Sequence, residues 1–299
     1  MHRLALACLL ALTPTLALAG DREAIEHFNK AAAHWKDADP STAVHHAEQA
    51  VAEAESKRVQ VNALLLLGRL HQGKTGDFDA ALRAYEQIIR SNVGVRDNTL
   101  KNLKAQAMIG KGTIYYSERD DLDTALAAYQ AAHRTYPSAH SADVLAQLCF
   151  RIGRDPSRSQ AARTKQLEYS EKLSREALHH DQQNRAKNAD AAKTAKFRLQ
   201  LVIVLLAQGK AEEAERIWSE TEQSKLDENA YYQLAVLKAL RAEGPDAVAA
   251  ELRKCLDPEA RPEARARNQL RKFVRTEPDF RPFVGRDEWK DLVEDESED

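Results

Sequence analysis

The residues of this chain that could bind a metal ion are histidines, and their spacing does not complete a site. Two adjacent pairs, His45-His46 and His179-His180, are the best candidates. Neighbouring residues on a helix point about 100° apart, so neither pair can hold one ion unless a distant part of the chain supplies another ligand. The pattern favours histidines on a solvated helix surface, and we predict no metal site.

Signatures of nucleotide binding and acyl transfer do not occur in the sequence either. Gly110-Lys111-Gly112 lacks the third glycine of a dinucleotide loop, and it falls inside a helical pattern instead of following a strand. The chain has no GxxxxGKS/T phosphate loop and no GxSxG nucleophile elbow. Carboxylates such as Glu171 lie one helical turn from a basic residue, here Arg175, which is typical of surface ion pairs. We therefore predict that the protein is not an enzyme and needs no cofactor.

The elements that position these residues are predicted to be helices. Of 299 residues, 43% are hydrophobic but only 6% are aromatic, and there are 11 glycines and 9 prolines. Abundant alanine favours closely packed helices, so we expect an all-α fold. The formal net charge of −2 indicates neither a nucleic-acid binder nor a polybasic membrane module. Beyond the N-terminus, the longest apolar stretch (201–207) is about a third of the roughly 20 residues that a membrane-spanning helix needs.

The first nineteen residues have the three parts of a secretory signal peptide. A basic start at residues 1–3 precedes an apolar run at 4–18, and Ala17-Leu18-Ala19 supplies the small residues of a cleavage site. A membrane anchor is the alternative, but the run is short and is interrupted by a proline. We predict cleavage between Ala19 and Gly20, and export to the periplasm or secretion.

A recurring spacing of small and aromatic residues divides the chain into helix pairs. Ala125, Tyr129 and Ala132 follow one another at intervals of four and three residues, so they share one helix face. Small side chains there let two antiparallel helices approach closely, and the tyrosine fills the space beside them. This segment predicts helices at about 99–118 and 121–135.

Glycines mark the turns between the helices of other pairs. Gly76, Gly209 and Gly244 each stand five residues before an alanine of the same pattern. We expect each to end a helix in the left-handed backbone conformation, which glycine adopts at little cost.

These segments resemble tetratricopeptide repeats. The best copies are 61–91, 106–137 and 195–222. The resemblance implies a right-handed superhelical solenoid of antiparallel helix pairs over residues 20–258. The region 138–193 fits poorly; there, a first helix and a partner at about 159–180 are separated by an insertion. Because each repeat of a solenoid contacts only its neighbours, Cys149 and Cys255 should not be bonded to each other.

Residues 259–299 differ in kind from the repeats. A basic amphipathic helix is expected at 262–275, followed by a segment rich in aromatic residues and by an acidic tail at 294–299. The segment is similar to the short closing unit of some bacterial repeat arrays, which implies that its aromatics cover the last helix. A detachable binding arm is the alternative. We expect the tail to be disordered and to screen the basic helix.

The resemblance also implies a protein or peptide partner held in a concave groove. The carboxylate clamp of some family members is missing, because Phe28 and Ala32 stand where it would need lysine and asparagine. The expected inner face mixes polar and apolar residues, which suits an extended peptide or a partner helix. The same apolar residues could instead pack against neighbouring helices. A structural accessory subunit of an envelope complex, assembled through the outer faces and C-terminal segment, is the second hypothesis. The candidate partner-binding residues are Asn62, Leu65, Arg69, Gln72, Ile114, Glu118, Lys196, Leu199 and Ile203.

Overall fold

The chain is all-helical throughout the part that the computed structural model describes, with no strand in those residues. The described residues are 19–36, 39–91, 97–184, 190–226, 230–259 and 264–296. They form two compact units, the first ending at Pro137 and the second beginning at Ser138. Each unit is described by itself below.

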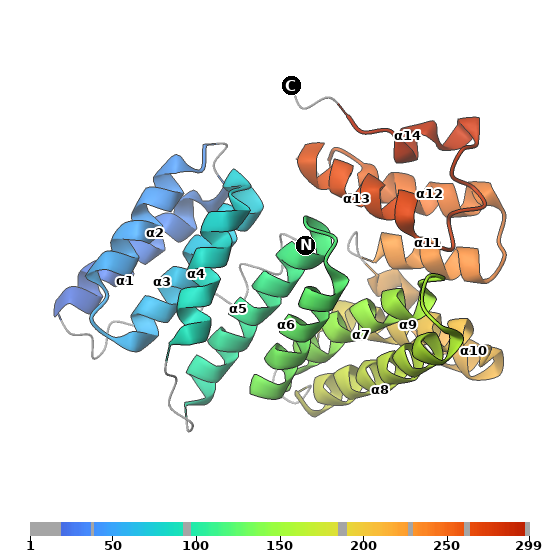
Figure 1. The fold of residues 1–299 in the computed structure, drawn as a ribbon, viewed down its shortest axis with the longest axis horizontal. Coiled ribbons are helices and arrows are strands. Elements are labelled where there is room, and N and C mark those ends of the chain that lie inside the picture. Colours follow the sequence, from blue (N-terminus) through green and yellow to red (C-terminus); the bar gives the residue numbers. More distant parts are fainter. Residues whose placement is uncertain are drawn as a thin grey trace. The chain divides into compact units, whose positions relative to one another are not determined.

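The first unit consists of helices joined by short turns, so that successive helices run back along one another (Figure 1). Each helix packs on the next, and α1 also contacts α3, as α3 contacts α5. Helices of this unit are α1 (Ala19–Ala33), α2 (Ser41–Glu53), α3 (Lys57–Leu70), α4 (Phe78–Arg90), α5 (Asn98–Ser117) and α6 (Leu122–Thr135). The last two confirm the helices expected at 99–118 and 121–135.

Aspartate side chains fix where three of these helices begin. Asp77, Asp97 and Asp121 each stand just before a helix and accept a hydrogen bond from the backbone N–H three residues later, at 2.8, 3.0 and 2.9 Å. Such a bond satisfies one of the N–H groups that the first turn leaves without an intrahelical partner, and it stabilises the helix by about 1 kcal/mol.

Tyrosines of α4 and α6 lie against glycines of the preceding and following helices. A Cβ added at Gly68 of α3 or at Gly110 of α5 would each come within 2.5 Å of the Tyr85 ring. A Cβ at Gly112 would lie 2.5 Å from Tyr129. Both tyrosines are buried. Because these glycines have no side chain, the tyrosine rings can lie directly against the backbone of the neighbouring helix.

Two of the three glycines that were expected to end a helix in the left-handed conformation do so. Gly76 and Gly209 have φ of 70° and 76°. The expectation is wrong for Gly244, whose φ is −59° and which instead precedes Pro245 at the start of a helix. There Ala242 takes the left-handed conformation, with φ of 56°, as Asp120 does before α6, with φ of 52°. The turn geometry recurs, but glycine does not always supply it.

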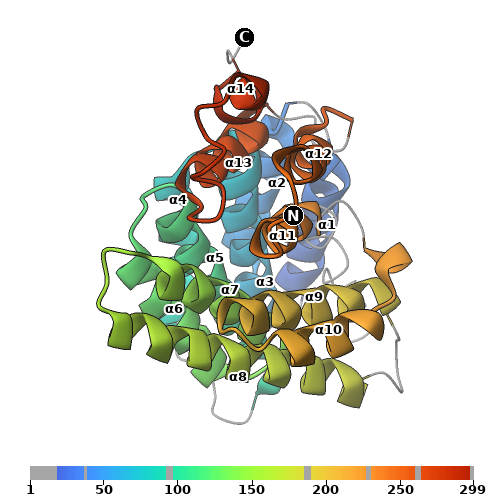
Figure 2. The same ribbon diagram turned by 90° about the vertical axis from the view of Figure 1, so that its right-hand side faces the viewer.

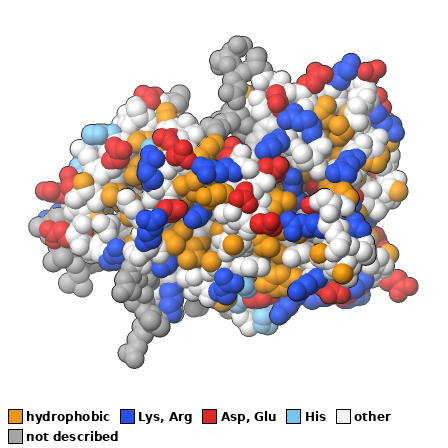
Figure 3. Space-filling model, in the orientation of Figure 1, with side chains coloured by type: hydrophobic (Ala, Val, Ile, Leu, Met, Phe, Trp, Pro, Cys, Tyr) orange, Lys and Arg blue, Asp and Glu red, His pale blue; other side chains and the backbone are white. Residues whose placement is uncertain are grey.

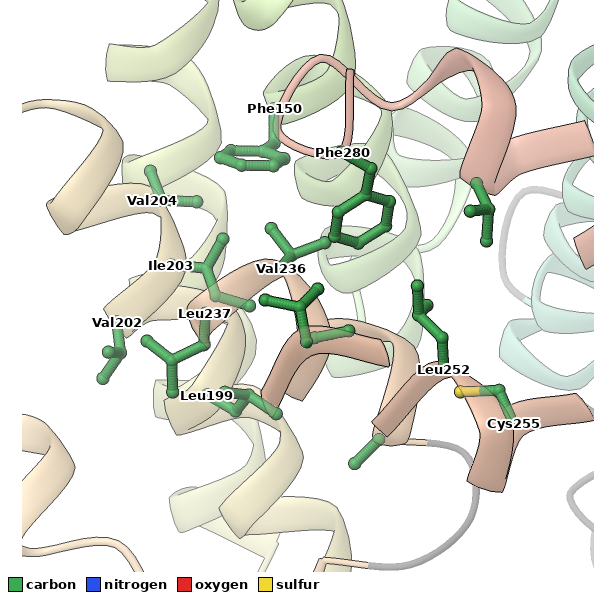
Figure 4. Packing of buried hydrophobic residues seen from close by; sticks show 14 of the residues in the cluster. Phe150, Leu199, Val202, Ile203, Val204, Val236, Leu237, Leu252, Cys255 and Phe280 are labelled. Atoms are coloured by element: carbon green, nitrogen blue, oxygen red, sulfur yellow. The ribbon is translucent and has the colours of Figure 1, made fainter. Parts of the chain in front are cut away.

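The second unit is built around α9, which α8, α10 and α11 cover (Figures 1 and 2). This explains the apolar run at 201–205, all of whose side chains are buried. Figure 4 shows Val202, Ile203 and Val204 of α9 with Val236 of α11 in this core. Helices of this unit are α7 (Ala139–Arg154), α8 (Gln160–Asn184), α9 (Ala191–Ala207), α10 (Ala211–Ser219), α11 (Tyr231–Leu240), α12 (Pro245–Leu256), α13 (Ala264–Thr276) and α14 (Lys290–Val293).

The C-terminal segment belongs to the core of the second unit. Phe280, Trp289 and Leu292 are fully buried in the same cluster as residues of α11 and α12. The Phe280 ring meets Tyr232 edge-on, with centroids 5.8 Å apart. Its aromatics therefore pack on the preceding helices, as the sequence predicts.

Asp295 and Glu296 of the acidic tail lie against the basic helix, where the sequence led us to expect disorder. Glu296 pairs with Arg267 and, at 2.7 Å, with Arg271, while Asp295 pairs with Arg275 at 2.9 Å. The predicted screening of the basic helix is confirmed for these residues; positions 297–299 lie outside the described chain.

Two further expectations concern the cysteines and membrane spans. Cys149 and Cys255 are buried and are not bonded to each other. Among the described helices, none combines the length and the apolar character needed to cross a bilayer.

Candidate partner-binding surfaces

The apolar residues expected to face a partner lie inside the protein. Leu65 is 4% exposed and Ile203 1%, while Ile114 and Leu199 are fully buried. Leu65 and Ile114 belong to the core of the first unit, and Leu199 and Ile203 to that of the second (Figure 4). In this arrangement they hold neighbouring helices together and present no surface to a ligand.

The polar candidates of the first unit are half-buried, and two of them, Arg69 and Gln72, bind side chains of other helices. Arg69 donates to Gln106 Oε1 at 2.7 Å, which joins α3 to α5. Gln106 in turn donates to Asn102 at 3.3 Å. The hydroxyl of Tyr85 donates to Gln72 Oε1 at 2.8 Å, so this glutamine supports the buried ring.

Two other polar candidates, Asn62 and Glu118, each have a hydrogen bond to a residue close in sequence. Asn62 donates to the carbonyl of Arg58 at 2.8 Å, and Glu118 accepts from Ser117 at 3.2 Å. Lys196 is half-buried on α9. Ala19 and Gly20 begin α1, and residues 1–18 of the expected signal peptide lie outside the described residues.

A hollow of about 420 Å³ opens on the second unit between α10, α11 and α12. We call it the aromatic pocket. Trp218 of α10 and Tyr231 of α11 are half-buried in its wall, together with Leu226 and Leu234. Its volume lies within the range of about 300–1,000 Å³ that is typical of binding pockets, and about half of its lining residues are polar or charged. Its full lining is Trp218, Gln223, Leu226, Tyr231, Leu234, Leu237, Lys238, Arg241, Glu243, Glu251 and Lys254.

Cations at the pocket rim are held by rings and carboxylates. The Arg241 guanidinium lies 5.4 Å from the Trp218 ring centroid, and it also pairs with Glu215 at 2.6 Å. The ammonium of Lys254 lies 5.4 Å from the ring of Tyr231. Contacts of this kind restrain long side chains, so the rim groups occupy defined positions before a ligand arrives.

A buried carboxylate connects two of the rim lysines. Glu251 accepts from Lys238 at 2.9 Å and from Lys254 at 3.0 Å. Burial by itself raises the pKa of Glu251, but the two lysines outweigh burial and hold that pKa below its usual value. The pocket floor is therefore ionised at neutral pH.

A second hollow, of about 340 Å³, lies where α7 and α8 meet the segment after α13. Arg154, Arg163 and Arg281 line it, with no carboxylate among the lining residues. Arg154 is held by Asp279. Its lining residues carry three positive charges, and no aromatic side chain stands among them.

Sequence reasoning did not find either hollow, because a hollow depends on how several helices pack on one another. A sequence signal that could have indicated the aromatic pocket is the presence of cations at positions 238, 241 and 254, close to the aromatic residues Trp218 and Tyr231.

On the face that Figure 3 presents, lysines and arginines are interspersed with acidic side chains. Within the described residues, no group of three histidine, cysteine, aspartate or glutamate side chains is arranged to hold a metal ion. Comparison of the chain with protein-family models, with curated proteins and with solved structures returned no match.

Proposed function

We propose that this protein is an exported, non-enzymatic scaffold of tetratricopeptide-like repeats that binds a protein or peptide partner. The observation that carries the proposal is the aromatic pocket, a preformed hollow with half-buried Trp218 and Tyr231 in its wall. Aromatic side chains in such positions supply much of the binding energy at protein interfaces. The buried state of Leu65 and Leu199 moves the proposed site from the expected inner face to this pocket.

The helix packing of the first unit supports the repeat architecture. In a solenoid of helix pairs, each first helix contacts its own partner and the first helix of the next pair. The contacts of α3 with α4 and with α5 follow this scheme. We extend it to a right-handed superhelix over residues 20–258, as the resemblance implies.

The occupant that fits the aromatic pocket is a peptide segment with one large apolar side chain. Trp218, Tyr231 and Leu234 offer apolar surface for that side chain. The rim supplies both donors and acceptors, through cations such as Lys238 and carboxylates such as Glu243. A peptide backbone needs both kinds of partner, whereas a nucleic acid would need an excess of cations.

The C-terminal segment does not favour the second hypothesis, in which the protein is an accessory subunit that assembles through this segment. An assembly arm would present its apolar residues to a partner, but Phe280, Trp289 and Leu292 are buried in the protein's own core. We therefore assign this segment the role of a cap.

Selection of peptides from a displayed random library tests the proposal. Peptides that bind the wild-type protein are counter-selected against Trp218→Ala, and their dissociation constants are measured by fluorescence anisotropy. Loss of an aromatic anchor costs about 2 kcal/mol, so Trp218→Ala should weaken binding about 30-fold.

The matched control is Tyr115→Ala, which removes a half-buried aromatic that also lies near two cations, Lys111 and Arg119. Because Tyr115 lies outside the aromatic pocket, binding should be unchanged. Equal losses from the two substitutions, or peptides that bind both variants as well as wild type, would refute the assigned site. Export is tested separately by the intact mass of the protein from its native cell, which should begin at Gly20.

A further inference from the structure

Four histidines gather where α1 meets α2 in the first unit. The Nδ1 atom of His27 on α1 lies 3.0 Å from the Nδ1 atom of His46 on α2. The rings of His34 and His45 are nearby, with centroids 6.2 and 5.7 Å from that of His46. His45 and His46 cannot hold one ion by themselves, but the packing of α1 on α2 brings a further histidine, His27, next to His46.

We propose that His27 and His46 form a two-histidine site for a divalent late transition metal ion, completed by water. This inference is independent of the proposed peptide binding. Two imidazole nitrogens bound at about 2.05 Å from one ion are about 2.9 Å apart at a 90° ligand angle, and about 3.3 Å apart at a tetrahedral angle. The observed separation of 3.0 Å falls between these values.

The outer nitrogen of His27 faces a carboxylate in the way that metal-binding histidines usually require. Its Nε2 atom lies 3.6 Å from Glu53 Oε2. That oxygen is buried and accepts no hydrogen bond in this arrangement. When Nδ1 binds the ion, the proton of the neutral ring resides on Nε2. Glu53 Oε2 is then a nearby acceptor for that proton, and a small approach of the two side chains from 3.6 Å would form the hydrogen bond.

An amide oxygen adds to the donors at the site. Gln49 Oε1 lies 3.2 Å from Nδ1 of His46. No third histidine, cysteine or carboxylate of the described residues completes the ligand set, so water and this amide fill the remaining positions. Imidazole suits Zn²⁺, Ni²⁺ and Cu²⁺, and the general order of affinities makes Cu²⁺ the tightest binder. The bound ion would tie α1 to α2.

Titration with ZnCl₂ and with NiCl₂ by calorimetry tests the site in the full chain. One equivalent should bind to wild type, and His27→Ala and His46→Ala should each abolish that binding. Glu53→Gln should weaken it about tenfold, because it removes a charged acceptor from the ligand's outer nitrogen. The matched control is the double variant His179→Ala, His180→Ala, which removes the other adjacent pair, whose rings are 6.5 Å apart; it should bind like wild type.

A measurement on wild-type protein keeps the proposal testable if a variant fails to fold. The electron paramagnetic resonance spectrum of the complex with one equivalent of Cu²⁺ should show hyperfine splitting from two imidazole nitrogens. Zn²⁺ should also slow hydrogen exchange in residues 19–53, because it binds only the folded pair. Binding that survives in His27→Ala or His46→Ala, a copper spectrum without two imidazoles, or no binding at all would overturn the proposal and leave a plain hydrogen bond between the rings.

Discussion

Replacing Gly110 by alanine should destabilise the first unit, although alanine is the better helix former. Glycine inside a helix costs about 1 kcal/mol relative to alanine, so propensity alone predicts stabilisation. The added Cβ, however, would lie 2.5 Å from Cζ of Tyr85 and 2.6 Å from its Cε2. The ring has little room to retreat, because its opposite edge, Cε1, already lies against Gly68 of α3.

The size of the effect follows from these opposing contributions. Overpacking a buried contact costs about 1–3 kcal/mol, and the gain in propensity offsets about 1 kcal/mol of that. The difference leaves a net loss of up to about 2 kcal/mol in the free energy of unfolding of Gly110→Ala. In the background Tyr85→Leu, where the distal ring atoms are gone, the same change should stabilise by about 0.5–1 kcal/mol.

Tyr85→Phe provides the control background, because it keeps the ring carbons and removes only the hydroxyl. Gly110→Ala should remain destabilising there. The free energies are measured by urea unfolding, with hydrogen exchange in α4 and α5 to confirm that the change is local. A stabilising Gly110→Ala in wild type, or the same effect in the leucine and phenylalanine backgrounds, would refute the close-packing explanation.

Three further predictions concern stability, pH and reactivity. Ala125→Leu should destabilise by about 1–3 kcal/mol because Ala125 is fully buried, whereas Ala128→Leu, at a half-buried position on the same helix, should cost much less; equal losses in urea unfolding would contradict the helix contact. Hydrogen bonds from Arg267 and a neighbouring arginine lower the pKa of Glu296 from 4.5 to about 2, so its contribution is complete above pH 4.5 and is lost as pH falls towards 2. The unfolding free energies of wild type and Glu296→Gln should therefore differ most above pH 4.5 and converge as the pH falls towards 2. A difference that grows on acidification would contradict a lowered pKa of Glu296. Burial raises the pKa of Cys149 to about 12, so iodoacetamide at pH 8 should modify it only after unfolding, and rapid labelling of folded protein, seen by peptide mass mapping, would show that the thiol is accessible.

The helices were predictable because their signals are local. The alanine and tyrosine spacing at 125–132 and the capping aspartate at 121 lie within one or two turns of the ends they define. The second helix of the poorly fitting region, expected from about residue 159, does begin there, since α7 ends at Arg154 and α8 begins at Gln160. Local propensity and helix periodicity were sufficient for these elements.

The surfaces were not predictable to the same degree, because they depend on which helices cover one another. The repeat register identified the helix that carries Ile114, but not that this side chain would be buried in one cluster with residues of α3 and α4. The contact of His27 with His46 joins residues 19 positions apart, and no helical period brings such a pair together. Only the packing of α1 on α2 does so.

Photo-crosslinking from inside the aromatic pocket tests the proposed function most directly. A benzoylphenylalanine residue is placed at Leu234, in the pocket wall, or at Glu212, an exposed position on α10 of the same unit. The protein is irradiated in its native cell, and the crosslinked peptides are identified by mass spectrometry. We predict that position 234 captures one defined segment of a partner protein, with an apolar residue at the crosslink, and that position 212 does not. Capture of the same proteins from both positions, or none from position 234, would contradict the assignment of this pocket as the partner-binding site.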